Sequence, residues 1–181
     1  MKTIFAILIG ALLSLPVQAQ FTGASLQASG LTCSMCSRAV KTALEKVPFV
    51  EKVAVDLKAQ EYNLSFKGGQ TVNFDALSKA VEDAGFSVSR LQVTADVSRV
   101  RVEKDTHIKI GSQYFHFLNV PKSELSGSTS FTLVDKHFVP AKAYKKWSAA
   151  SKMECVQTGK AAACCTTDRV GSGARIYHAV I

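Results

Sequence analysis

The sequence contains no apolar stretch long enough to cross a membrane. Its apolar run from Ile4 to Leu13 has about half of the roughly 20 consecutive apolar residues that a transmembrane helix needs. The run follows Lys2 and precedes the small residues Val17–Ala19, which is the pattern of a cleaved export signal. We therefore expect residues 1–19 to be a signal peptide. The mature protein is expected to begin at Gln20, to be periplasmic or secreted, and not to span the membrane.

Proline and tryptophan are scarce, which argues against one class of thiol enzyme. The chain has 4 prolines and 1 tryptophan, and no proline lies between Pro48 and Pro121. Thioredoxin-like proteins usually carry a tryptophan before their Cys-x-x-Cys motif and a cis-proline facing it. A thiol–disulfide redox role is therefore the less favoured reading of the Cys-x-x-Cys motif in this chain, and we expect no enzymatic activity.

Acidic residues are outnumbered by basic ones, 14 to 22, for a formal charge of +8. The imbalance lies in the second half, because residues 20–95 carry 8 basic and 7 acidic residues while residues 96–181 carry 13 and 7. Nucleic acid is not expected as a partner of an exported protein. The scattered basic residues instead indicate solvated surface, or contact with an acidic partner or an anionic envelope surface.

The length indicates one ordinary domain or two small ones. Removing 19 residues from 181 leaves 162, and 47% apolar residues are enough to build packed cores. A change of pattern near residue 95 favours two domains, 20–95 and 96–181.

Hydrophobic periodicity in the first unit predicts the order strand, helix, strand, strand, helix, strand. The predicted strands fall near residues 25–29, 53–57, 62–66 and 86–93, and the helices run from Cys36 to Val47 and from the N-cap Asn73 to Ala84. This order is the βαββαβ arrangement of ferredoxin-like domains, in which two helices cover one face of an antiparallel sheet. The fold class is therefore α+β.

Two cysteines, Cys33 and Cys36, stand between the first strand and the first helix. The positive end of a helix lowers the pKa of a thiol and favours the thiolate, which is the species that binds metal. Two sulfur ligands, with no His, Asp or Glu in the motif, suit Cu(I), Hg(II) or Ag(I) at low coordination number, whereas structural Zn(II) normally has four ligands.

The segment Gly30-Leu31-Thr32-Cys33-Ser34-Met35-Cys36 resembles the Gly-Met-Thr-Cys-x-x-Cys signature of heavy-metal-associated domains. This family includes copper chaperones, modules of metal pumps and the periplasmic mercury-binding protein. The segment 80–86 also resembles the family's second helix and the loop that follows it, which implies that Phe86 shields the metal. Leu31 replaces the usual Met, which in the family packs inward, so the change should leave the metal chemistry intact.

Other roles for the same residues remain open. In an oxidising compartment Cys33 and Cys36 would form a disulfide unless a metal or a reductant protected them. Met35 is either a thioether ligand or, as we expect, a surface residue or one packed against Phe86.

The second unit is predicted to be small and mainly β. Five short strands are expected around residues 100–102, 108–110, 114–120, 131–134 and 176–181, with one helix that has Pro140 at its first position. A small barrel similar to the oligonucleotide/oligosaccharide-binding fold fits this order.

Three further cysteines, Cys155, Cys164 and Cys165, lie in an expected long loop. We expect Cys155 to pair with one of the other two as a disulfide, and a second soft-metal site is the alternative. The four histidines, all in this half, have no ligand-motif spacing and are not predicted to be ligands.

Taken together, the sequence predicts an exported protein that captures Cu(I) and transfers it to a protein partner. Hg(II) binding for detoxification is the nearest alternative, and Ag(I) or Zn(II) are further candidate ions. A protein of a different class, in which the metal domain senses or docks while the second unit binds an envelope partner, also fits.

Overall fold

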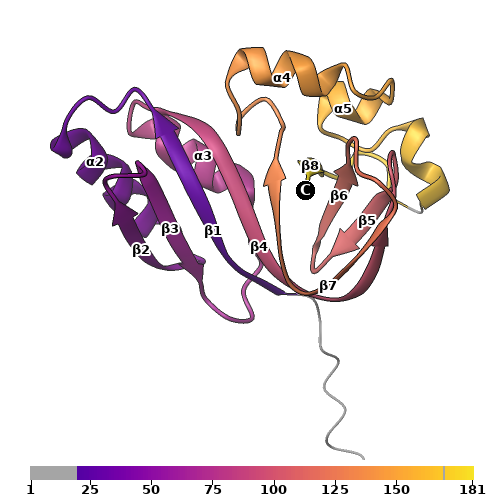
Figure 1. The fold of residues 1–181 in the computed structure, drawn as a ribbon, viewed down its shortest axis with the longest axis horizontal. Coiled ribbons are helices and arrows are strands. Elements are labelled where there is room, and N and C mark those ends of the chain that lie inside the picture. The colour runs from indigo at the N-terminus through magenta and orange to yellow at the C-terminus, as the bar shows by residue number, and fades with distance from the viewer. Residues whose placement is uncertain (1–19, 169) are drawn as a thin grey trace, which may run out of the picture.

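The computed structural model describes residues 20–168 and 170–181, so the predicted signal peptide lies outside the described residues. The predicted βαββαβ order is confirmed. Its elements are β1 (Gln20–Ser29), α2 (Ser34–Glu45), β2 (Val50–Asp56), β3 (Glu61–Phe66), α3 (Phe74–Asp83) and β4 (Ser87–Val102). Helices α2 and α3 lie side by side against one face of these strands (Figure 1).

The two helices form where the sequence pattern predicts them. Val40 and Leu44 are the fully buried residues of α2, and Val47 just beyond its end is also buried. The Asn73 side chain accepts a hydrogen bond from the Asp75 backbone N–H at 3.0 Å and so caps α3.

The second half is not a barrel. Its elements are β5 (His107–Ile110), β6 (Gln113–Phe117), β7 (Ser123–Leu133), α4 (Ala141–Ser148), α5 (Glu154–Thr158), the 3₁₀ helix η1 (Ala163–Asp168) and β8 (Ile176–Val180). The described strands form one open sheet in the order β2-β3-β1-β4-β7-β8-β6-β5. The barrel prediction was wrong because β7 pairs with β4 of the first half. The strands of the second half therefore extend the first sheet and do not close into a barrel.

The helical content of the second half also exceeds the prediction. The predicted helix is present as α4, with Pro140 as its N-cap residue. The expected long loop instead contains α5 and η1. Burial explains α5, since Cys155 and Val156 pack into a second, smaller core. Gly159, with φ of +68°, ends the helix in a left-handed conformation.

The two predicted units share a strand and a core. The predicted boundary after Ala95 falls inside β4, which pairs with β1 on one side and β7 on the other. At the junction the Phe74 ring lies 5.0 Å from Phe21, 6.2 Å from Phe115 and 5.2 Å from Tyr177, measured between centroids. Whether residues 20–95 and 96–181 are separate domains stays a prediction.

Candidate metal site

The Cys-x-x-Cys loop connects β1 to α2. Gly30 turns the chain with φ of +87°, a left-handed conformation that glycine adopts without strain. Cys33 is the N-cap residue of α2, and its Sγ accepts a hydrogen bond from the Cys36 backbone N–H at 3.4 Å. The two Sγ atoms lie 2.8 Å apart, with Cys33 exposed and Cys36 half-buried. Both sulfurs therefore meet at one accessible point at the N-terminus of a helix.

The surroundings of Cys36 favour its thiolate. The pKa of Cys36 falls from 9.0 to about 7, first because of its hydrogen bond with Cys33 and then because of hydrogen bonds from Thr32. The Thr32 Oγ1 lies 3.8 Å from the Cys36 sulfur. The first turn of α2 contains no acidic residue to oppose the positive end of the helix.

Alkylation of Cys36 with iodoacetamide should therefore accelerate through a midpoint near pH 7, because the thiolate is the reacting species. In Cys33→Ala, which removes the largest cause of the shift, the midpoint should rise toward the ordinary value for a thiol. Mass spectrometry of peptides from the folded protein gives the rates. Cys155 is an internal control that should stay unmodified, because burial raises the pKa of its thiol. A Cys36 midpoint near 9 in the unsubstituted protein would contradict this account of the sulfur pair.

The site is open on the side of the β2–β3 turn. A pocket of about 310 Å³ adjoins Cys33 and is lined by Leu31, Thr32, Cys33, Ser34, Ser37, Val55, Asp56, Leu57 and Gln60. The buried Tyr62 donates its hydroxyl hydrogen bond to the first turn of α2, 3.2 Å from the Ser37 carbonyl oxygen. The helix start is thus held by the sheet while the loop remains accessible.

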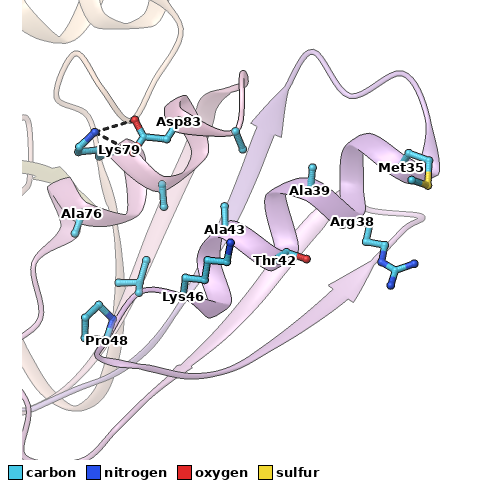
Figure 2. A pocket seen from close by; sticks show the side chains of 13 residues that line it. Met35, Arg38, Ala39, Thr42, Ala43, Lys46, Pro48, Ala76, Lys79 and Asp83 are labelled. Atoms are coloured by element: carbon cyan, nitrogen blue, oxygen red, sulfur yellow. Dashed lines mark hydrogen bonds and ion pairs between the residues drawn. The ribbon is translucent and has the colours of Figure 1, made fainter.

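Met35 is not among the residues that line this pocket. Its side chain is 69% exposed and lies at one end of a groove of about 700 Å³ between α2 and α3, which Ala39, Ala43 and Ala76 help to line (Figure 2). Two cations on α2, Arg38 and Lys46, also border the groove. Met35 is therefore a surface residue, and a role for it as a metal ligand or as a shield of the site stays a prediction.

Phe86 lies beside the start of the metal loop. A Cβ atom placed on Gly30 would be 3.8 Å from Cδ1 of the Phe86 ring, which is half-buried. Leu31 packs against the main core, as expected for the residue that replaces the family's inward-facing Met. A role for Phe86 in shielding a bound ion stays a prediction.

The three remaining cysteines come together in the second half. The sulfurs of Cys155, Cys164 and Cys165 lie within 4.8 Å of one another, and all five cysteines of the chain carry free thiols. The predicted disulfide within this group stays a prediction.

Two histidines that the sequence did not assign to a site join Cys155. The ring nitrogens of His107 and His116 and the sulfur of Cys155 also lie within 4.8 Å of one another, and all three residues are buried. The spacing of these residues along the chain carries no ligand motif. The pairing of β5 with β6 places His107 opposite His116, and α5 places the Cys155 sulfur 3.5 Å from one ring and 3.6 Å from the other.

Within the described part of the chain, no helix is both long and apolar enough to cross a membrane.

Comparison with known proteins places the segment that contains the Cys-x-x-Cys loop in a known family. The profile of the heavy-metal-associated domain matches residues 25–87. The mercuric transport protein periplasmic component of Serratia marcescens is 39% identical over 89 residues, which is 49% of this chain and 97% of that protein.

Two further known proteins are similar to part of this chain. The copper-transporting ATPase HMA4 of Oryza sativa subsp. japonica is 37% identical over 78 residues, which is 43% of this chain and only 8% of the ATPase. The crystal structure of oxidized MerP from Ralstonia metallidurans CH34 is 35% identical and covers 39% of this chain and 94% of that chain, with a TM-score of 0.34.

Proposed function

This chain belongs to the heavy-metal-associated domain family, and on that premise we propose that it captures one Cu(I) ion through the thiolates of Cys33 and Cys36 and passes it to a protein partner. The observation that carries the proposal is the convergence of two accessible sulfurs, 2.8 Å apart, at the N-terminus of α2. Thiolates are the ligands that soft d¹⁰ ions prefer.

The geometry supports binding and release more than permanent storage. Sulfurs that share an ion with bonds of about 2.3 Å stand about 4.0 Å apart at a trigonal angle, so Cys33 and Cys36, now 2.8 Å apart, must separate to accept it. Cys33 is exposed and belongs to the loop, which allows that movement. Because this chain supplies only two ligands, one coordination position of the ion stays open for a sulfur of the partner protein. The partner's thiolate binds the ion, one cysteine of this chain leaves, and no electron is transferred.

Hg(II) is the second candidate cargo. It is favoured by the mercuric transport proteins, which match this chain over 97% of their own length and are named as periplasmic components. The same dithiolate chemistry holds either ion. A strain that lacks the gene distinguishes the two, because the Cu(I) proposal expects its growth to respond to copper and the alternative expects it to respond to mercury.

We further propose that the protein acts outside the cytoplasm and without catalysis. The periplasmic relatives and the export pattern of residues 1–19 support this location. In such a compartment oxidation of Cys33 and Cys36 competes with metal binding, so the ion or a reductant must keep the thiols available.

The direct experiment is an anaerobic titration of the reduced mature protein with Cu(I), Hg(II) and Zn(II) in separate samples. We expect Cys33→Ser/Cys36→Ser to lose one bound Cu(I) or Hg(II) per chain relative to the unsubstituted protein, because its only two ligands at this site are gone. Ser34→Ala is a matched control, since it changes an exposed residue between the two cysteines and keeps both thiols. Equal stoichiometry in the double variant and the unsubstituted protein would contradict the assignment.

A further inference from the structure

Three histidines stand in a row across neighbouring strands of the second half. The strand register places His107 on β5 opposite His116 on β6, and His116 opposite His178 on β8. The ring centroids lie 4.6 Å apart for the first pair and 5.2 Å for the second. All three side chains are buried, with residue exposures of 7%, 0% and 2%. Such a row of imidazoles inside a core needs polar partners to be stable.

Each ring has a carboxylate on one of its nitrogens. Nδ1 of His107 lies 2.7 Å from Asp168, and Nδ1 of His178 lies 2.8 Å from Asp135. On His116 the contact is through the other nitrogen, since Nε2 lies 3.1 Å from Asp105.

A carboxylate only accepts hydrogen bonds, so the nitrogen that it contacts carries the proton. In a neutral imidazole the second nitrogen then presents a lone pair. Histidines that bind metals are oriented by carboxylates in this way.

The free nitrogens converge on one sulfur. Nε2 of His107 lies 3.5 Å from Sγ of Cys155, and Nδ1 of His116 lies 3.6 Å from the same atom. A thiol has one proton, so it can satisfy one of these two lone pairs and not both. Among the described residues, Nε2 of His178 is also buried without a hydrogen-bond partner. Around Cys155, neutral rings of His107 and His116 therefore offer two lone pairs to one thiol proton, and a cation in place of that proton could bind both.

The distances match those of a metal centre. With metal–nitrogen bonds of about 2.0 Å and metal–sulfur bonds of about 2.3 Å, a tetrahedral angle places nitrogen and sulfur about 3.5 Å apart. The two observed separations are 3.5 and 3.6 Å. The sulfurs of Cys164 and Cys165 both lie within 4.8 Å of the Cys155 sulfur in a second group that shares Cys155, so one of them would have to move toward the histidines to become the fourth ligand.

We propose that His107, His116 and Cys155, with one sulfur of the Cys164-Cys165 pair, form a second metal site that binds Zn(II). Two nitrogens and two sulfurs in a tetrahedron are a donor set that Zn(II) prefers. Two thiolates balance the charge of a divalent ion, which suits a buried position. With all four ligands supplied by this chain, the ion stabilises the second half, whereas the ion at Cys33 and Cys36 remains exchangeable.

The test uses Cys33→Ser/Cys36→Ser, so its outcome does not depend on the first site. The reduced protein is loaded anaerobically with Co(II), a spectroscopic substitute for Zn(II). We expect one Co(II) per chain, with thiolate-to-cobalt absorption and the ligand-field bands of a tetrahedral ion, and its displacement by Zn(II). Adding Cys155→Ser should at least halve the thiolate absorption, because one of the two sulfur ligands is gone. Adding His107→Gln should weaken Co(II) binding by more than about 100-fold, because loss of a direct ligand exceeds the cost of losing an outer-shell partner.

His137→Gln in the same background is the matched control, since His137 is exposed and contacts Glu82 outside the cluster. X-ray absorption of the Zn(II)-loaded protein needs no substitution in the cluster and should show both nitrogen and sulfur neighbours. The proposal is overturned if the reduced protein binds no Co(II), if Cys155→Ser leaves the thiolate absorption unchanged, or if the zinc neighbours include no nitrogen. The proposal would also be overturned if Cys155 were found in a disulfide and reduction of that disulfide restored no Co(II) binding. Cys155 would then have a purely structural role.

Discussion

Replacing Phe74 with alanine is expected to lower the free energy of unfolding by about 3–5 kcal/mol, the usual cost of removing a fully buried phenylalanine. Phe74 is 0% exposed and contacts aromatic rings from both halves of the chain, Phe21 on one side and Phe115 and Tyr177 on the other. Because the ring lies at the junction, both halves should be destabilised together. Denaturant unfolding under reducing conditions, followed by far-ultraviolet circular dichroism and by Trp147 fluorescence, measures both effects.

The two probes should report the same lowered midpoint, since Trp147 lies in the second half and the substitution in the first. Leu57→Ala is the control, because Leu57 is 69% exposed and its truncation should change stability by less than about 0.5 kcal/mol. If the Trp147 midpoint stayed unchanged in Phe74→Ala, the halves would unfold separately and the shared core would not couple them.

Replacing Asp135 with alanine is expected to cost about 3 kcal/mol, because it leaves the buried donors of His178 unpaired and removes one of the two carboxylates that Arg175 contacts. One carboxylate oxygen accepts hydrogen bonds from His178 Nδ1 at 2.8 Å and from Arg175 Nη1 at 3.2 Å, and the other accepts one from the His178 backbone N–H at 2.9 Å. Arg175 also forms a two-bond ion pair with Asp75 on α3. The substitution therefore weakens a network that joins both halves. Urea unfolding at neutral pH measures the loss.

The same carboxylate predicts a dependence of stability on pH. Burial alone would raise the pKa of Asp135, but the hydrogen bonds from His178 and the charge of Arg175 outweigh it and hold that pKa below its usual range. A lowered pKa in the folded state stabilises the protein above the unfolded-state value of about 3.9 and loses that effect as the pH falls below it. Asp135→Asn should therefore flatten the loss of stability below about pH 4. An unchanged acid slope in Asp135→Asn would contradict this assignment.

The first half of the fold was predictable because its signals are local. Val40 and Leu44 repeat at helical spacing, Asn73 marks a helix start, and Tyr62, Leu64 and Phe66 alternate as in a half-buried strand. The metal loop could be placed for the same reason, since both of its cysteines belong to one short segment between a strand and a helix.

The second half was less predictable because its structure depends on pairing between distant segments. Nothing in the strand β7 indicates that Phe131 pairs with Val93 of β4, and this register is what makes one open sheet. The histidine cluster has the same origin. His116 and His178 are far apart in the chain and meet only because β6 and β8 pair in parallel.

The missed helices had a different cause. Cys155 lies in a stretch rich in small residues, whose composition is typical of a loop. Its burial with Val156 and Cys165 depends on a second core formed by distant residues such as Leu118 and Ile176. Tertiary packing, which no local pattern reveals, therefore decides the helical state of this segment.

The most direct test of the central proposal is X-ray absorption of the unsubstituted, reduced protein carrying one equivalent of Cu(I). If Cys33 and Cys36 capture the first ion, the copper should have sulfur neighbours and no nitrogen neighbours, because the loop offers no imidazole. Nitrogen neighbours would place the first copper at His107, His116 and Cys155, and would contradict the assignment of the exchangeable ion to the Cys-x-x-Cys loop.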